Sequence, residues 1–475
     1  MEHKRRKGVL LIIFILHAAA AYAQSTAPRL VPERFAVEIG SASHPLTVAQ
    51  LIEASLIFSG ADSATLSEDT LRFRKIITEA AAALEPYRTD YERGNELLVF
   101  MHTHLLTRYS EPQTRVDTLL RTGEFNCVSS AVVYMILGRA LGLKVEGVYT
   151  PDHAFCTVQA AGRLVDVETT NRFGFDPGSK TAFHDAFGNT GFTYVPPGNY
   201  SLRTATDGRG LISFILQNRM SLLERQYRFS EAVGLAVDRY AVLGSKTALN
   251  DLASEVGNYC ALLNQQGDYA TAIDFVDSVE KDYGSLPQLV KLMDGLIHNE
   301  VLRLSSSGDY AGALRLVAAK GASGALDQAA VASLRQMVSE RQLTQAVQTQ
   351  PFASALSQVE TSYRQGDIPT ALYNEYLVAL YGKEAQRTAA NQGYLAAANL
   401  LEEGIKLTKG DAQLERGRQV YVNNYIATVH NNFASLFNNR DYTQAEKVLN
   451  AGLKVVPDSS VLNQDLGLLR QATGN

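Results

Sequence analysis

Residues 127–141 carry apolar side chains almost all round a helical projection, and this feature most restricts how the chain can fold. A helix that is apolar on every side has to be covered by other elements on every side. Asn126 is a good N-cap, because its side chain can accept from a free amide, and Gly142 can close the helix in the left-handed conformation. The sequence therefore predicts a buried helix with Cys127 in its first turn.

The start of a helix favours the reactive form of a cysteine. Free N–H groups and the positive end of the helix dipole stabilise the thiolate, which is the form that attacks carbonyl carbons. Cysteine is also among the residue types most often buried in a core, so Cys127 taken alone has a structural interpretation too. The chain has only 3 cysteines, too few for a disulfide framework, and a single staple between Cys127 and Cys156 is the alternative.

Downstream of this helix, residues 153–158 and 163–167 alternate in the manner of two strands around a turn at 160–162. If the turn holds an even number of residues, His153 lies on the same face as Asp166 and Glu168. The opposite face is then wholly apolar and belongs against a core: it carries Ala154, Cys156, Val158, Val165 and Val167. The pattern predicts a carboxylate beside the imidazole, with Asp166 as the partner of His153 and Glu168 as the alternative.

A nucleophilic thiol, an imidazole base and an orienting carboxylate are what thiol acyl transfer requires. Their order on helix, strand and strand resembles the transglutaminase-like superfamily, in its bacterial branch with C-terminal tetratricopeptide-like helices. The resemblance implies a papain-like α+β cysteine domain in which Cys127 is the nucleophile, His153 the base and acid, and Asp166 the orienting carboxylate. The motifs that carry it are Gly-Glu-Phe-Asn-Cys-Val-Ser-Ser at 123–130, Leu-Gly-Leu at 141–143, Pro-Asp-His-Ala-Phe at 151–155 and Val-Asp-Val-Glu at 165–168.

The back half of the chain repeats a short pattern. In four copies a glycine or arginine is followed by an aspartate, then by an aromatic or apolar residue and, three positions later, by an alanine; an earlier copy fits less closely. These copies resemble tetratricopeptide repeats, whose second helix begins at such a turn and packs through its alanine. The spacing between copies is uneven, so a generic helical domain is the alternative. The copies are Gly267-Asp268-Tyr269 with Ala272, Gly308-Asp309-Tyr310 with Ala313, Gly366-Asp367-Ile368 with Ala371, Arg440-Asp441-Tyr442 with Ala445 and an earlier Tyr227-Arg228-Phe229 with Ala232.

A chain of 475 residues is too long for one compact core. Turn-forming glycines and prolines are dense between residues 171 and 210, which indicates long loops and a domain boundary near 204–210. We therefore expect a transglutaminase-like domain at 24–205 that begins with helices, and an all-α tetratricopeptide-like domain at 206–475.

The first 23 residues have the pattern of a signal peptide. Four basic residues at 4–7 precede an apolar run at 9–21, and Ala21-Tyr22-Ala23 is a small-x-small cleavage site. The apolar run is shorter than the about 20 residues that a spanning helix needs. We expect a periplasmic or secreted protein that begins at Gln24 and has no membrane span after cleavage; an uncleaved N-terminal membrane anchor is the alternative.

Other classes of function lack their signatures. The formal net charge is -5 with no basic stripe, so nucleic acid is not an expected partner. No Gly-rich nucleotide loop or His-Glu-x-x-His motif occurs, and His102 and His104 lie two apart on a predicted helix, where they do not share a face. We therefore expect no cofactor and no metal.

The sequence thus predicts an exported thiol acyl-transfer enzyme that acts on peptide or protein amides, either as a hydrolase or as a transglutaminase. Loops near 171–199 would select water or an amine as the acyl acceptor. The helical repeats would bind a protein partner or the substrate. The competing hypothesis is a non-catalytic exported scaffold whose repeats bind a protein while the front half is only a support.

Overall fold

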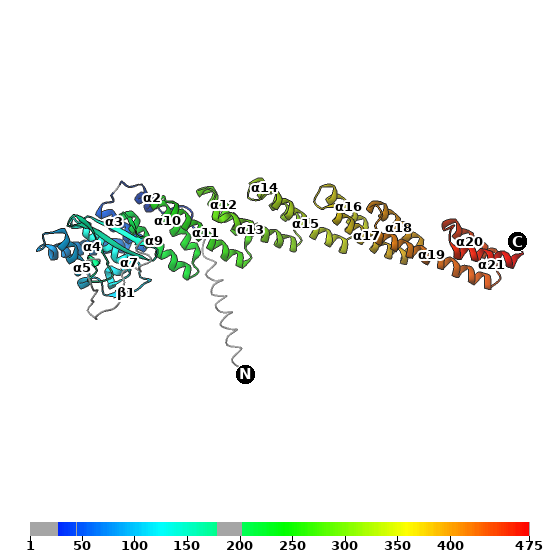
Figure 1. Cartoon of the computed structure of the whole chain (residues 1–475), viewed down its shortest axis with the longest axis horizontal. Helices are drawn as coiled ribbons and strands as arrows, with labels where there is room; N and C mark the ends of the chain where they lie inside the picture. Colours follow the sequence, from blue (N-terminus) through cyan, green and yellow to red (C-terminus); the bar gives the residue numbers. More distant parts are fainter. Residues whose placement is uncertain (1–26, 44, 178–201, 475) are drawn as a thin grey trace, which may run out of the picture. The chain divides into compact units, whose positions relative to one another are not determined.

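The structure is a computed structural model that describes residues 27–43, 45–177 and 202–474. The chain divides into two compact units, Met1–Leu292 and Met293–Asn475. Helices dominate both, and the described strands all lie in the first unit (Figure 1). The predicted signal peptide at 1–23 lies outside the described residues, as do most of the loops expected near 171–199.

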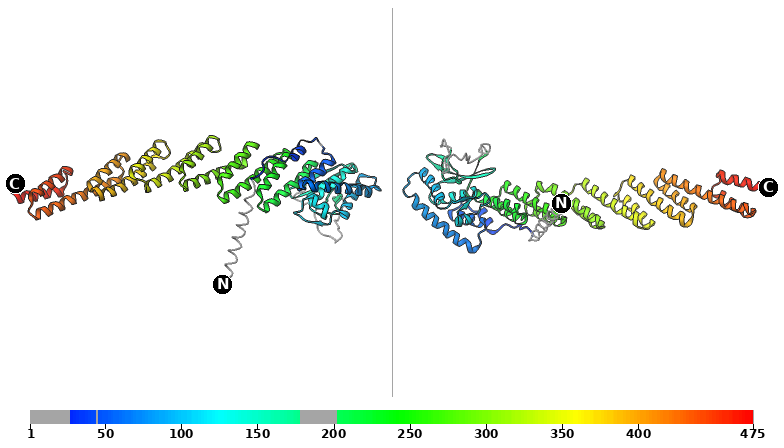
Figure 2. Two further views of the ribbon diagram at one scale, coloured as in Figure 1. Left: turned by 180° about the vertical axis from the view of Figure 1, so that it is seen from behind. Right: turned by 90° about the horizontal axis from the view of Figure 1, so that it is seen from below.

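The described part of the first unit begins with five helices, four of which (α3 to α6) pack on the central helix α7 (Cys127–Ala140), beside the strands (Figure 2). The predicted buried helix is confirmed, since its residues from Val128 to Gly138 are all buried. Asn126 caps it by accepting from the Ser129 amide at 2.9 Å. The five preceding helices are α2 (Arg34–Ser41), α3 (Val48–Ser59), α4 (Ser63–Leu84), α5 (Asp90–His104) and α6 (Val116–Thr122).

The main sheet is antiparallel, with the strand order β5-β4-β3-β6. Ala160 pairs with Arg163, so the β4–β5 turn holds two residues, Ala161 and Gly162, both with positive φ as a type I′ turn requires. The predicted even-residue turn is confirmed. The strands are β3 (Val145–Thr150), β4 (His153–Ala160), β5 (Arg163–Val167) and β6 (Thr204–Thr206), and a second small sheet pairs β1 (Arg108–Tyr109) with β2 (Glu124–Phe125) in parallel.

The β4–β5 hairpin turns the face predicted to be apolar toward the core. All five residues of that face are buried and pack in one cluster with the side chains of α7. Burying a run of β-branched side chains against a helix that is itself apolar all round is the main source of stabilisation here. The opposite face of the hairpin carries His153 and the two candidate carboxylates, as alternation predicted.

The first unit continues beyond the expected boundary at residue 205. Helix α9 (Gly208–Arg225) packs on α3 and α7, and α10 (Phe229–Leu243) packs on α9 and α2. Arg209 donates to the carbonyl oxygens of Gly40 at 2.9 Å and Ala42 at 2.7 Å. The change from strands to helices does fall at 204–210, but the compact unit ends at Leu292, because these helices complete the front core.

Helical hairpins follow to the end of the described chain. The last two helices that lie wholly in the first unit are α11 (Lys246–Gln266) and α12 (Tyr269–Tyr283), and α13 (Pro287–Ser306) spans the division. The second unit contains α14 (Tyr310–Ala322), α15 (Gln328–Thr349), α16 (Phe352–Arg364), α17 (Thr370–Gln392), α18 (Tyr394–Thr408), α19 (Ala412–Asn438), α20 (Tyr442–Val455) and α21 (Ser460–Thr473).

The short repeated pattern marks the turns of these hairpins. Asp268, Asp309 and Asp441 each cap the next helix by accepting from a backbone amide three residues later. The alanines Ala272, Ala313 and Ala445 are fully buried, as tetratricopeptide-like packing predicts.

The copy at Gly366 differs from the others. Its aspartate, Asp367, pairs with Arg335 at 2.9 Å instead of capping a helix, and α17 begins only at Thr370, after Pro369. Ala371 is exposed and the buried residue of this copy is Ile368, so the expectation that Ala371 packs inward was wrong. The proline sets the later helix start because its ring fits the N-terminal boundary of a helix and not the interior.

Within the described residues, no helix combines the length and apolar character needed to cross a membrane.

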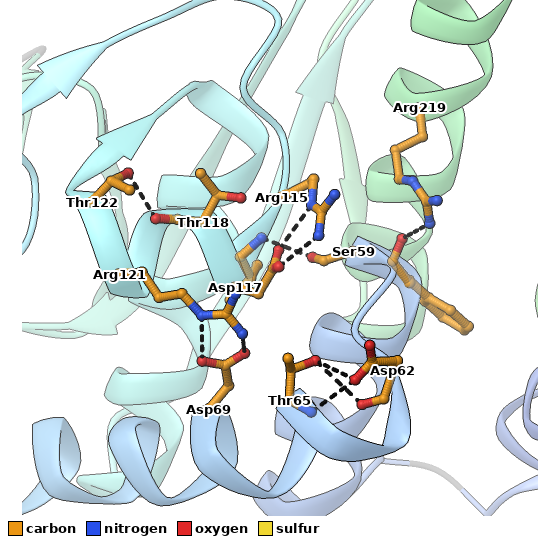
Figure 3. A network of polar contacts seen from close by, with 12 residues as sticks. Ser59, Asp62, Thr65, Asp69, Arg115, Asp117, Thr118, Arg121, Thr122 and Arg219 are labelled. Atoms are coloured by element: carbon orange, nitrogen blue, oxygen red, sulfur yellow. Dashed lines mark hydrogen bonds and ion pairs between the residues drawn. The ribbon is translucent and has the colours of Figure 1, made fainter.

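A polar network ties α6 to α3 and α4, just ahead of Cys127 (Figure 3). The buried carboxylates Asp69 and Asp117 pair with Arg121 and Arg115, at 3.0 and 2.7 Å. Ser59 Oγ accepts from the amide of Val116 at 2.8 Å and donates to the Ser55 carbonyl at 2.6 Å. The serine thereby satisfies the first amide of α6, which would otherwise be buried without a partner.

Replacing Ser59 by alanine is therefore expected to lower the free energy of unfolding by about 1–3 kcal/mol, the cost of leaving a buried amide unpaired. Ser55→Ala is the matched control on the same helix, because the Ser55 hydroxyl donates only to the Ile52 carbonyl at 2.9 Å. Chemical denaturation of both variants measures the difference. Equal losses for the two would show that the Val116 amide does not depend on Ser59.

Candidate active site

Cys127 is the first residue of α7 and lies half-buried at the wall of a cleft. The preceding residue, Asn126, forms a capping box with Ser129, in which each side chain accepts from the other's backbone amide at 2.9 Å. Asn126 also donates from Nδ2 to the Glu111 carbonyl at 3.0 Å. These contacts fix the helix start, so the position of the thiol is set by backbone and not by side-chain freedom.

His153 is the first residue of β4, and its side chain joins a thiol to a carboxylate. Nε2 lies 2.6 Å from Oε2 of Glu168. The neighbouring Cys127 side chain raises the pKa of the same ring, and both residues line the cleft. Since Nε2 is engaged by Glu168, Nδ1 is the nitrogen left for the thiol. The structure thus brings together two of the three predicted site residues, Cys127 and His153, with Glu168 as the third member.

Asp166 is not the orienting carboxylate, so that prediction was wrong. Its two oxygens accept from Arg203, at 2.7 and 2.9 Å. In the hairpin register Asp166 lies opposite Thr157, four residues along β4 from His153. At about 3.3 Å per residue this is a separation of about 13 Å, which no aspartate side chain spans.

The same register explains why Glu168 reaches His153. Val167 lies opposite Cys156, so the next position places Glu168 opposite Phe155, only two residues from His153. Diagonal neighbours on one face of a sheet are about 7–8 Å apart at Cα, within reach of a long side chain. Alternation identifies the face, but only the count of paired positions identifies the carboxylate.

Glu168 is fully buried, and both of its oxygens are occupied. Oε2 faces His153, while Oε1 accepts from the amide and hydroxyl of Thr170 at 2.9 and 2.6 Å. The Glu168 amide donates to the Gly174 carbonyl at 2.8 Å. A Cβ on residue 174 would lie 2.0 Å from the Glu168 carbonyl oxygen, so only glycine permits this approach. The carboxylate is therefore held in one orientation.

Thr169, the residue next to Glu168, is anchored from two helices. Its hydroxyl lies 2.8 Å from Oγ of Ser130, one turn after Cys127 on α7. Its carbonyl lies 3.0 Å from Nε2 of His102 on α5. Burial of the ring lowers the pKa of His102, which favours a neutral imidazole that donates to this carbonyl. His102 is a positioning residue that the sequence did not single out for this role.

The protonation of His153 follows from its neighbours. Burial by itself lowers the pKa of the ring, but the hydrogen bonds and charges of Cys127 and Glu168 outweigh burial and raise the pKa of His153 to about 10. At neutral pH the ring is therefore an imidazolium, and it faces the Cys127 sulfur. An imidazolium is the form of histidine that can give a proton to a leaving amine.

The cleft beside Cys127 has a volume of about 740 Å³. Helix α9 forms one wall, with a polar stripe at helical spacing that includes Ser213, Gln217, Asn218 and Ser221. Tyr109 lines the rim near the thiol; burial, followed by the charge of Cys127, raises its pKa to about 12, so it stays a phenol. The expected domain boundary at residue 205 placed α9 in the second domain, so this wall was not predicted. The helical spacing of its polar residues is visible in the sequence.

The other two cysteines are buried, as predicted. Sγ of Cys156 lies 3.3 Å from the Ala131 carbonyl, and burial raises its pKa far above the ordinary range. Burial likewise raises the pKa of Cys260 to about 12. All three cysteines are free thiols, which rules out the staple between Cys127 and Cys156 in this structure. In the described part of the chain, no group of three His, Cys, Asp or Glu side chains is placed to hold a metal ion.

Two variants separate the roles of the carboxylates. Glu168→Gln removes the charge that stabilises the imidazolium, so the pKa of His153 is expected to fall well below about 10. Asp166→Asn, which weakens the contact with Arg203, should leave that pKa unchanged. NMR titration of the His153 ring measures both, and a drop in the Asp166 variant alone would reverse the assignment.

The arrangement supplies a nucleophile, a base that is also an acid, and a carboxylate that orients the base. Cys127 and His153 both line the cleft, and the buried Glu168 bonds His153. No protein-family model matches the chain, and no curated protein matches it.

Proposed function

We propose that the chain is a thiol enzyme that transfers an acyl group from a peptide or protein amide, through Cys127, to water or to an amine. One observation carries the proposal: a single imidazole, His153, lies beside Cys127 at the wall of an open cleft and bonds the buried Glu168 carboxylate. A purely structural cysteine needs neither a charged imidazole nor access to solvent. The resemblance of the motifs to the transglutaminase-like superfamily supports the same chemistry.

The reaction follows from the protonation states. The Cys127 thiolate attacks the amide carbonyl carbon, and the imidazolium of His153 gives its proton to the leaving amine as the C–N bond breaks. The product is a thioester on Cys127. A water or amine then attacks this thioester while His153 takes the acceptor's proton, and the thiolate leaves. Glu168 holds the ring in position and stabilises its positive charge.

The start of α7 is also suited to the negative charge that develops on the carbonyl oxygen. The first amides of a helix have no intrahelical partner, and the amides of Ser129 and Ser130 are taken by Asn126. The other two first-turn amides belong to Cys127 and Val128, which line the cleft. Backbone donors at a positive helix end are a recurrent way to stabilise an oxyanion.

The remaining parts of the proposal concern location and partners. The signal-peptide pattern at 1–23 supports export to the periplasm or beyond, with the N-terminal anchor as the alternative. The helical hairpins of the second unit support a role in binding a protein partner or the substrate, because stacked hairpins offer extended surfaces.

Alkylation with iodoacetamide under reducing conditions tests the nucleophile. The native protein should take up one carbamidomethyl group at Cys127 at pH 7, located by mass spectrometry. In His153→Ala the rate should fall roughly tenfold or more, because an unassisted thiol has only a few per cent thiolate at that pH. Cys260→Ala is the control and should react as the native protein does. A native protein in which Cys127 stays unmodified would favour the non-catalytic scaffold.

The acid role of His153 gives the reaction an upper pH limit. Because the raised pKa of His153 is about 10, the imidazolium persists through neutral pH and is lost as the pH rises through about 10. Release of the amine from an amide substrate should therefore decline above that pH. Alkylation of Cys127 by iodoacetamide needs only the thiolate and should persist there. Parallel pH profiles of the two reactions check this, and a common decline would point to unfolding instead.

A further inference from the structure

A second hollow, of about 730 Å³, adjoins the catalytic cleft. The two share Pro112 and Leu222 in their walls, so they are neighbours. Between them lies the segment that carries Glu111, whose carbonyl holds the Asn126 cap of α7. The second hollow is therefore next to the reacting thiol without containing it.

Guanidinium groups dominate the charge of this hollow. Four arginines line it, against two glutamates, and most of these groups are already paired. Glu124 pairs with Arg108, which lies outside the hollow. The pairs of the lining arginines are Arg29 with Asp238 at 2.6 Å, Arg115 with Asp117 at 2.7 Å and Arg228 with Glu231 at 2.6 Å.

Arg219 is the exception. Nη1 donates to the Phe58 carbonyl at 2.6 Å, and among the described residues no carboxylate pairs with it (Figure 3). Burial and then the charge of Arg115 lower the pKa of Arg219, while the more weakly acting carboxylates of Asp117, Asp238 and Glu231 raise it. A half-buried cation in this position is normally compensated, because an unpaired buried charge is costly.

We propose that this hollow binds a carboxylate of the same peptide chain whose amide is presented to Cys127, so that acidic peptides are the preferred acyl substrates. The inference rests on the proposed function. Arg219 supplies the charge and the fork geometry that match a carboxylate. Gln226 and Ser230 line the same hollow and offer further polar contacts, and Leu222, Leu223 and Leu235 take the apolar part of the side chain.

Binding is measured first on Cys127→Ala, so that it does not depend on reaction. Calorimetric titration with the α-amide of N-acetyl-glutamate and its neutral isostere, the α-amide of N-acetyl-glutamine, isolates the side-chain carboxylate. The acid is expected to bind at least about tenfold more tightly than the amide, as charge-assisted hydrogen bonds allow. Adding Arg219→Gln should remove that preference. Gln226→Glu, which puts a like charge into the hollow and leaves Arg219 in place, should also weaken binding of the acid.

Arg34→Gln, on the exposed face of α2, is the matched control for loss of one positive charge and should keep the preference. Thermal melting confirms that each variant is folded. Equal binding of acid and amide, or no binding of either, would overturn the proposal, as would inorganic phosphate binding as tightly as the acid. Iodoacetamide labelling of Cys127 in the otherwise native protein is a separate measurement, so loss of the thiol chemistry and loss of the carboxylate site give different results.

Discussion

The buried carboxylate of Glu168 is the interaction on which the site depends. A charge with no exposure to water is tolerated only where hydrogen bonds compensate it, and here His153 and Thr170 bond both oxygens of the carboxylate. That requirement fixes the first residue of β4 and the segment after β5 with respect to each other. It also makes the imidazole positive, which prepares the thiol that faces it.

Packing then decides on which face of the hairpin His153 and Glu168 lie. The apolar face of the β4–β5 hairpin is buried with α7 in one core, so His153 and Glu168 are left on the other face. The bond between Ser130 and Thr169 links the first turns of α7 to the segment that holds Glu168. Since α7 is covered on all sides, it has little freedom to shift, and its first residue meets the imidazole at the mouth of the cleft.

Asp166 lies on the same face of the hairpin as His153 but has a different role. Its bidentate contact with Arg203 joins β5 to the segment that leads into β6, and the Arg203 guanidinium also lies 5.3 Å from the centre of the Phe155 ring. Phe155 is the strand neighbour of His153 and stacks near its ring, at 6.3 Å between centres. Asp166 therefore supports the surroundings of the base and does not orient it.

Local patterns in the sequence determined a large part of this protein. The capped buried helix, the two-residue hairpin turn, the apolar face of the hairpin and most turns of the helical hairpins all follow from side-chain periodicity and capping, which act over a few residues. For the same reason Cys127 and His153 were identifiable as a pair. Tertiary structure alone decided which carboxylate reaches His153, that α9 closes the front core and walls the cleft, and that no carboxylate in the described part of the chain pairs with Arg219. These depend on distances along paired strands and on contacts between residues far apart in the chain, and a local pattern fixes the direction of a side chain but not what lies within its reach.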